Sequence, residues 1–243
     1  MGAVGLLYVG AVLFLNGMMI LGKVQPKSAA IFNLLVGGLQ VITPTFLIFT
    51  AGGDTNTILT ASGIYLFGFT YLYVGITLLA GLDTTGVGWF SLFVAAAAVG
   101  YSFANFRILN DKPFGVIWLY WAFLWFLFYL VLGLKLDGLN PYTGWVTAIE
   151  GIVTAAVPAF FILIGYWATW NQNTIALTLG IFGVVMALVL LPLTHRGPTR
   201  AYHPKRLPAA RDPERHPTNR PHTRRKDCHA GRSIYRRPDE VHA

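Results

Sequence analysis

Seven long apolar segments dominate the sequence and restrict what the chain can fold into. They cover residues 3–22, 28–50, 60–80, 89–106, 114–134, 143–167 and 174–193. About 20 apolar residues in a helix span the roughly 30 Å hydrocarbon core of a bilayer, where a helix satisfies its own backbone hydrogen bonds. Charged side chains make up only 12% of the chain, against about 25% in soluble domains, which argues against a soluble enzyme. We predict an all-α integral membrane protein, a bundle of six to seven transmembrane helices.

Charge is concentrated at the C-terminal end. Residues 194–243 hold 13 of the 18 Lys and Arg residues and 5 of the 10 Asp and Glu residues, which accounts for the whole net charge of +8. Because the cytoplasmic loops of membrane proteins carry an excess of Lys and Arg, we expect the N-terminus outside and the C-terminus in the cytoplasm. The expected organisation is a six-helix channel domain over 1–170, a seventh helix over 171–193 and a basic, Pro/Arg/His-rich disordered tail over 194–243.

Few polar side chains lie at bilayer depth, so each of them is informative. Glu150 is the one carboxylate well inside an apolar segment, and inserting such a group costs on the order of 2.5–3.5 kcal/mol. We therefore expect Glu150 to border a water-accessible corridor, with a neutral, hydrogen-bonded packing role as the alternative. Asn16 and Asn33 lie in the first two segments, and an amide at this depth either joins helices or binds a solute. Leu6, Val9 and Leu13 share the helical face of Asn16.

Aromatic residues form two further groups with helical spacing. Phe69 and Tyr73 are four residues apart in the third segment, and Trp118, Trp121 and Trp125 share one face of the fifth. Tryptophan usually lies at the membrane interface, but Trp121 falls near the middle of its segment. Such a ring either packs against other helices or forms a wall beside a passing molecule.

Several chemistries are disfavoured by what the apolar segments lack. All six histidines and Cys228 follow residue 193, so we expect no haem, copper, zinc or iron–sulfur site in the membrane. No phosphate-binding glycine motif occurs, which argues against ATP-driven pumping by this chain. A single buried acid without paired cations argues against an ion path. We expect no enzyme activity, no cofactor and no nucleic-acid partner. A small, neutral, polar solute fits what remains.

The sequence resembles the AmiS/UreI family of urea channels and short-chain-amide transporters. The resemblance runs through residues 1–160 and is carried by Leu6-Leu7-Tyr8-Val9-Gly10, Asn16-Gly17, Lys23-Val24-x-Pro26-Lys27-Ser28, Asn33, Val36-Gly37-Gly38-Leu39, Leu66-Phe67-Gly68-Phe69-Thr70-Tyr71-Leu72-Tyr73, Trp89-Phe90-Ser91-Leu92-Phe93-Val94-Ala95, Ile117-Trp118-Leu119-x-Trp121, Trp125, Ile149-Glu150-Gly151-Ile152-x-Thr154-Ala155 and Pro158-Ala159.

This resemblance implies a six-helix protomer in a homo-oligomeric ring, by resemblance a hexamer, in the bacterial plasma membrane. It also implies passive conduction of urea, acetamide or other short-chain aliphatic amides through a channel in each protomer. Carried over by position, the solute pathway comprises Leu6, Val9, Leu13, Asn16, Phe69, Tyr73, Trp118, Trp121, Trp125 and Glu150. Two departures concern Thr77, where the family often has Asn, and the seventh segment with its tail, which extends beyond six helices.

The mechanism that we expect is a slot. Flat, uncharged amides pass edge-on between aromatic and leucine walls, while their N–H groups meet Glu150 or Asn16 and their carbonyl meets an indole N–H or a hydroxyl. Ions are excluded by the cost of desolvation. Two alternatives remain open, a proton-coupled amide transporter that uses Glu150 and a non-conducting membrane scaffold or sensor.

The resemblance also implies a prediction about pH, because acid-gated members use titrating histidines and carboxylates in their outward loops. Here the joints over 51–57, 108–113 and 168–173 contain no histidine, the side chain whose pKa falls near neutral pH. We expect amide flux without acid gating. Flux into proteoliposomes should change little between about pH 7 and pH 5, and strong activation over this range would contradict the prediction.

Overall fold

The computed structural model describes residues 2–195, and within them it is helical throughout its regular structure, with seven candidate membrane spans. The helices are α1 (Gly2–Ile20), α2 (Pro26–Thr50), α3 (Thr55–Ala80), α4 (Thr85–Arg107), α5 (Lys112–Phe128), α6 (Asn140–Glu150), α7 (Val157–Leu163) and α8 (Gln172–Leu190). Short turns are the π-helical η1 (Tyr129–Gly133) and η3 (Gly151–Ala156) and the 3-10 turns η2 (Asp137–Leu139), η4 (Trp167–Thr169) and η5 (Leu191–His195). The expected helical membrane fold is confirmed. From residue 196 onward the predicted tail lies outside the described residues.

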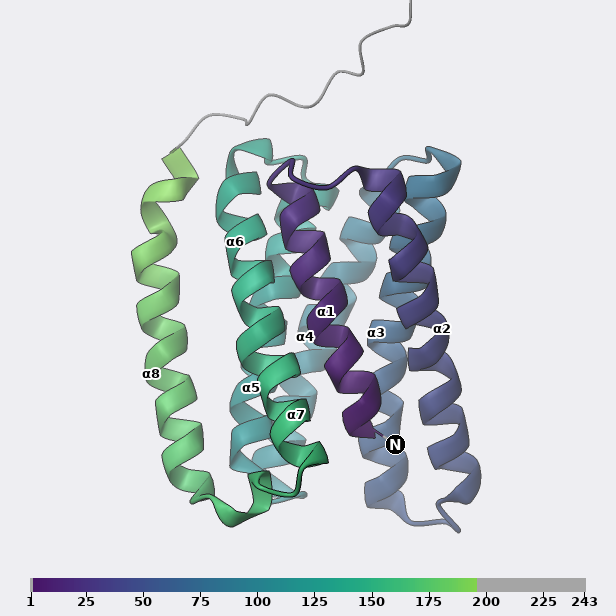
Figure 1. The fold of residues 1–243 in the computed structure, drawn as a ribbon, viewed down its shortest axis with the longest axis vertical. Helices are drawn as coiled ribbons and strands as arrows, with labels where there is room; N and C mark the ends of the chain where they lie inside the picture. The colour runs from purple at the N-terminus through teal and green to yellow at the C-terminus, as the bar shows by residue number, and fades with distance from the viewer. Residues whose placement is uncertain (1, 196–243) are drawn as a thin grey trace, which may run out of the picture. The chain divides into compact units, whose positions relative to one another are not determined.

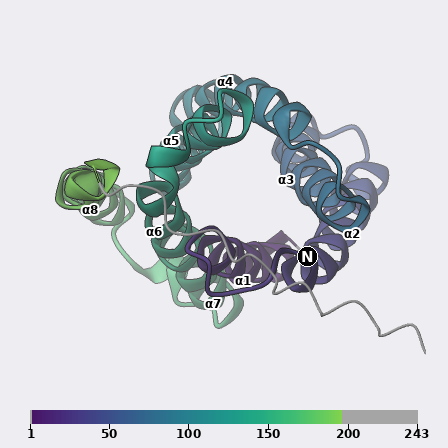
Figure 2. The same ribbon diagram turned by 90° about the horizontal axis from the view of Figure 1, so that it is seen from above.

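The first six spans form a closed ring in chain order (Figures 1 and 2). Each span contacts the next along the chain, and α1 closes the ring by packing against α6, η3 and α7, which together make the sixth span. Helix α8 lies outside this ring, against α5 and α6 (Figure 2). We call the end of the bundle at which α1 begins the N-terminal face. By the predicted orientation it is the outer face.

Local signals in the sequence fix where the helices begin and end. A helix leaves its first N–H groups without partners, and short polar side chains supply them. The carboxylate of Asp54 accepts from the Thr57 amide at 2.9 Å, that of Asp111 from the Phe114 amide at 3.1 Å, and Asn171 caps α8. Helix α3 ends at Ala80 and is followed by Gly81, whose φ of 67° is a left-handed conformation that glycine adopts without strain.

Glycines allow the helices of the ring to approach closely. A Cβ added at Gly10 or Gly17 would lie 2.6 Å from the main chain of the sixth span, and one at Gly88 would lie 2.1 Å from the amide nitrogen of Gly133. Helices gain little hydrophobic stabilisation from one another in lipid, so close packing of this kind is a main source of association. Gly88 thereby positions α4 against η1.

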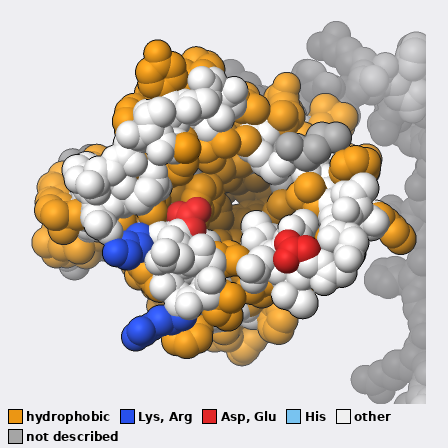
Figure 3. All heavy atoms as spheres, turned by 90° about the horizontal axis from the view of Figure 1, so that it is seen from below, with side chains coloured by type: hydrophobic (Ala, Val, Ile, Leu, Met, Phe, Trp, Pro, Cys, Tyr) orange, Lys and Arg blue, Asp and Glu red, His pale blue; other side chains and the backbone are white. Residues whose placement is uncertain are grey.

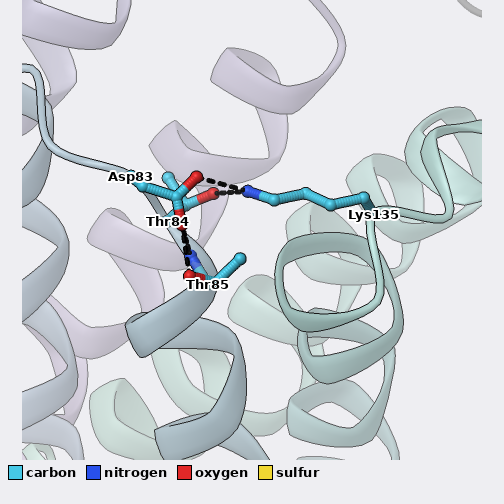
Figure 4. Close-up of polar contacts among 4 residues, drawn as sticks. All are labelled: Asp83, Thr84, Thr85 and Lys135. Atoms are coloured by element: carbon cyan, nitrogen blue, oxygen red, sulfur yellow. Dashed lines mark hydrogen bonds and ion pairs between the residues drawn. The ribbon is translucent and has the colours of Figure 1, made fainter. Parts of the chain in front are cut away.

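A polar cluster joins two loops at the face opposite the N-terminal face (Figure 4). Lys135 donates to Asp83 at 3.1 Å and to the Thr84 hydroxyl at 2.8 Å, while the amide and hydroxyl of Thr85 donate to Asp83. The hydrogen bonds from Thr85, together with Lys135, lower the pKa of Asp83 to about 2. Because this pKa is depressed, the stabilisation is complete above the ordinary value of 3.8 and is lost only as the pH falls through about 2.

The Gly88 contact predicts a strong difference between two glycines of the same helix. Gly88→Ala places a methyl group against the backbone of η1 and should lower stability by about 1–3 kcal/mol or more. Gly100→Ala is the matched control, because a Cβ there has nothing within 4 Å. Thermal unfolding in detergent should show a lower midpoint for Gly88→Ala alone, and equal midpoints for both variants would contradict this account of the packing.

Candidate functional site: a cavity that ends on an aromatic band

A cavity of about 350 Å³ lies within the ring at its N-terminal face. It receives side chains from each of the six spans, and Figure 3 shows this face with a hollow at its centre and an acidic group beside it. Among the expected pathway residues, Leu6, Val9, Trp118 and Trp121 line it. The remaining lining residues are Gly2, Ala3, Gln40, Thr60, Ile64, Phe67, Tyr101, Asn105, Leu109, Asp111, Phe114 and Ile162.

Four packed aromatic rings, which we call the aromatic band, lie at the deep end of this cavity. Phe67, Trp118 and Trp121 line it, and Trp125 is fully buried outside the lining. The ring of Phe67 packs against Trp118, Trp121 and Trp125 with centroid separations of 5.7, 4.7 and 5.0 Å. The ring of Tyr101 stacks on the ring of Trp118, with a centroid separation of 4.6 Å. Phe67 meets Trp121 and Trp125 edge-to-face, and offset-stacked or edge-to-face pairs are worth about 0.5–1.5 kcal/mol beyond their buried area. Phe67 is therefore the hub that holds the three indoles of α5 in place.

Hydrogen bonds fix two of these indoles further. The N–H of Trp121 donates to the Thr154 hydroxyl at 2.9 Å, and that of Trp125 donates to the Thr70 hydroxyl at 3.3 Å. Thr154 in turn donates to the main-chain carbonyl of Glu150 at 2.6 Å. The expected hydrogen bond from an indole to the carbonyl of a solute therefore finds Trp121 and Trp125 already engaged. Their rings are walls of fixed orientation.

Glu150 lies deeper than the cavity. Its side chain is fully buried, it is absent from the cavity lining, and neither carboxyl oxygen has a hydrogen-bond partner within residues 2–195. Tyr71, Thr77 and Thr143 likewise have unpartnered hydroxyls in this part of the chain. The expected corridor beside Glu150 is not open here, and a pathway role for this residue stays a prediction.

The remaining expected residues of α1 and α5 are buried beyond the cavity. Leu13 and Trp125 have no exposed surface. Asn16 forms a reciprocal amide pair with Asn33, with N–H···O distances of 2.9 and 2.7 Å. Of the two roles left open for Asn16, this geometry favours joining α1 to α2, because its amide is already engaged. A pathway role for Asn16 stays a prediction.

The structure distinguishes two faces of α3. Phe69 and Tyr73 are 51% and 40% exposed and are absent from the cavity lining, whereas Phe67 and Tyr71 are 4% and 1% exposed. A pathway role for Phe69 and Tyr73 stays a prediction. The i, i+4 spacing fits both pairs equally well. The polar Thr70 does not decide between the pairs, because it lies three residues from both Phe67 and Tyr73. The burial of the side chains in the folded bundle distinguishes them.

Three polar groups of the cavity also escaped the sequence analysis, namely Gln40, Asn105 and Asp111. Burial raises the pKa of Asp111 above its ordinary value, and the hydrogen bond from the Phe114 amide partly offsets this. Asn105 and Asp111 lie at or just after the end of an apolar segment, where polar residues are common. Gln40 lies in the middle of the segment 28–50, so its depth in the membrane was a signal that the sequence analysis passed over. Within residues 2–195, no three His, Cys, Asp or Glu side chains gather closely enough to hold a metal ion.

Comparison with known proteins gives a consistent match. The family model described as "AmiS/UreI family transporter" matches residues 1–166. The chain belongs to this family. It is 54% identical to "Putative transporter protein AmiS2" of Rhodococcus erythropolis, over 78% of this chain and 90% of the relative. It is 51% identical to "Putative amidate substrates transporter protein" of Mycolicibacterium smegmatis, over 81% and 91%.

A solved structure agrees with this assignment. The urea channel of Helicobacter pylori in its closed state is 36% identical, with a TM-score of 0.63, covering 69% of this chain and all of that one. This AmiS/UreI chain is accordingly a multi-pass membrane protein of a channel and transporter family, and it is not an enzyme. Helix α8 lies beyond the family match, which ends at residue 166.

The Asn16–Asn33 pair predicts coupling between two helices. Either Asn16→Leu or Asn33→Leu leaves one buried amide without its partner, so each should destabilise the protein by about 1–3 kcal/mol. The double variant should cost less than the sum, with a coupling energy of roughly 0.6–1.7 kcal/mol. Unfolding midpoints of the four proteins measure this cycle, and strictly additive effects would show that the amides do not act as a pair.

Proposed function

We propose that this protein is a passive channel for small neutral amides, namely urea, acetamide and other short-chain aliphatic amides, in the bacterial plasma membrane. We further propose a homo-oligomeric ring, with the N-terminal face outside. Family membership and the names of the relatives support the substrate class. The observation that carries the proposal is the cavity that ends on the band of Phe67, Trp118, Trp121 and Trp125.

The shape and polarity of this band suit a flat amide. We expect aromatic faces held in fixed orientations to admit a planar molecule that enters edge-on and to reject tetrahedral or branched solutes. Ions would lose their hydration shell beside these rings without gaining equivalent ligands. Net hydrogen bonds of about 0.5–1.5 kcal/mol are weak enough to release the solute again. Because the cavity does not reach Glu150, a solute passes this residue only when the bundle opens beside it.

A second candidate, proton-coupled amide transport, draws on a single feature. Glu150 is a fully buried carboxyl group without a hydrogen-bond partner among the described residues, and such a group could carry a proton across the middle of the membrane. A passive channel equilibrates amide and never accumulates it. A coupled transporter accumulates amide while a pH gradient lasts.

Stopped-flow light scattering on proteoliposomes separates these functions. We expect urea and acetamide to equilibrate faster than in protein-free vesicles, glycerol to remain excluded, and a pH gradient to have no effect on the final distribution. Glu150→Gln should preserve passive flux, whereas it should abolish accumulation by a coupled transporter. Vesicles as impermeable to urea and acetamide as protein-free ones would contradict both functions and leave a scaffold or sensor.

Trp121→Ala tests the slot itself. Removing this indole opens the deep end of the cavity, so glycerol permeability should rise relative to acetamide. Trp145→Ala is the matched control, because Trp145 is 45% exposed on α6 and is absent from the cavity lining. Unchanged discrimination between glycerol and acetamide in Trp121→Ala vesicles, measured at equal protein content, would refute selection by the aromatic band.

A further inference from the structure

Two carboxamide side chains line the cavity at its polar end. Gln40 comes from α2 and Asn105 from α4. Both residues are buried, with exposed fractions of 2% and 6%, so only a small part of each side chain faces the cavity. A buried amide carries two kinds of polar atom, a donating NH2 and an accepting oxygen. Which of the two faces the solute decides what the cavity can recognise.

The hydrogen bonds of the two amides answer this question. The Nε2 of Gln40 donates to the Gly5 carbonyl at 2.7 Å, and the Nδ2 of Asn105 donates to the Tyr101 carbonyl at 2.8 Å. A main-chain carbonyl can only accept, so the NH2 group must be the end that meets it in both residues. None of the hydrogen bonds within residues 2–195 engages Oε1 of Gln40 or Oδ1 of Asn105. Both oxygens therefore remain available as acceptors.

Asp111 adds a third acceptor to the same cavity. One of its oxygens accepts from the Phe114 amide at 3.1 Å, which leaves lone pairs for a further donor in either protonation state. The rings of Phe67 and Trp118 supply flat, apolar faces in the same lining. The cavity thus combines oxygen acceptors with flat apolar walls.

We infer that Gln40, Asn105 and Asp111 form an acceptor site that recognises the N–H groups of a primary carboxamide or urea before it reaches the aromatic band. This inference rests on the proposed function and deepens it, because it names the groups that select N–H donors. A solute with a free NH2 group satisfies these oxygens. An N,N-dialkylated amide of the same class brings no donor and leaves them unpaired, at a cost.

Competition against labelled urea tests the site without requiring the competitor to pass the band. In wild-type proteoliposomes we expect acetamide to inhibit best, N-methylacetamide less and N,N-dimethylacetamide least, following two, one and no N–H groups. We define the spread as the ratio of the inhibition constants of N,N-dimethylacetamide and acetamide. In the Gln40→Met/Asn105→Leu variant, this spread should narrow by about 2- to 12-fold for each hydrogen bond lost. Steric effects of the methyl groups cancel, because the comparison is between proteins.

Gln172→Met is the control variant. Gln172 is a carboxamide that donates to the main-chain carbonyls of Trp167 and Trp170 and is absent from the cavity lining, so its spread of inhibition should equal that of the wild type. A second measurement reads binding without flux: each amide should raise the unfolding midpoint of detergent-solubilised protein in the same order, and the double variant should lose this order. The single variants Gln40→Met and Asn105→Leu provide the same readout if the double variant folds poorly.

The possible outcomes separate the two levels of the proposal. Urea flux with an unchanged spread in the double variant would overturn the acceptor site and leave the channel intact. Absent flux together with an ordered, variant-sensitive midpoint shift would support the acceptor site and overturn the channel. A midpoint that responds equally to all three amides in the wild type would overturn the acceptor site.

Discussion

Closure of the ring by α1 against the sixth span is the contact on which the cavity depends. A Cβ added at Gly10 or at Gly17 would lie 2.6 Å from the main chain of Ala156 or Gly144, respectively. Leu6 and Val9 reach the cavity from this same helix. In a bilayer, where apolar burial between helices contributes little, such backbone contact is what holds neighbouring helices at a fixed distance. Larger residues at these positions would separate the helices and open the ring.

The π-helical segment η3 lies directly after Glu150 and connects this contact to the aromatic band. A π-turn shifts the backbone hydrogen-bond register and frees groups that a regular helix would use, and it occurs often at functional sites. Here the Glu150 carbonyl accepts from Thr154, and Thr154 accepts from Trp121. The position of one cavity wall is thereby tied to the backbone beside the buried carboxyl group.

The sequence allowed the spans to be predicted to within a few residues, because length and hydropathy depend on the bilayer alone. The orientation of each helix about its axis was harder. In α3 the aromatic spacing fitted two faces, and Thr70 lies three residues from both Phe67 and Tyr73, so only the packing of the helix distinguishes buried Phe67 from exposed Phe69. Asn16 gave no indication of its partner, since pairing with Asn33 depends on how α1 and α2 meet. The orientation of the Gln40 amide depends on its hydrogen bond to the Gly5 carbonyl, which only the folded structure shows.

The polar groups along the inside of this bundle differ in whether the protein already pairs them. Trp121, Trp125, Gln40 and Asn105 each donate an N–H to a protein acceptor. In contrast, the unpartnered buried side-chain polar atoms of the described residues are the hydroxyls of Tyr71, Thr77 and Thr143, which can donate or accept, and the carboxyl oxygens of Glu150. An unpaired polar group in a low-dielectric interior is costly unless something pairs with it. A small molecule that carries both N–H groups and a carbonyl can pair with either kind of group, whereas an apolar molecule can pair with none of them.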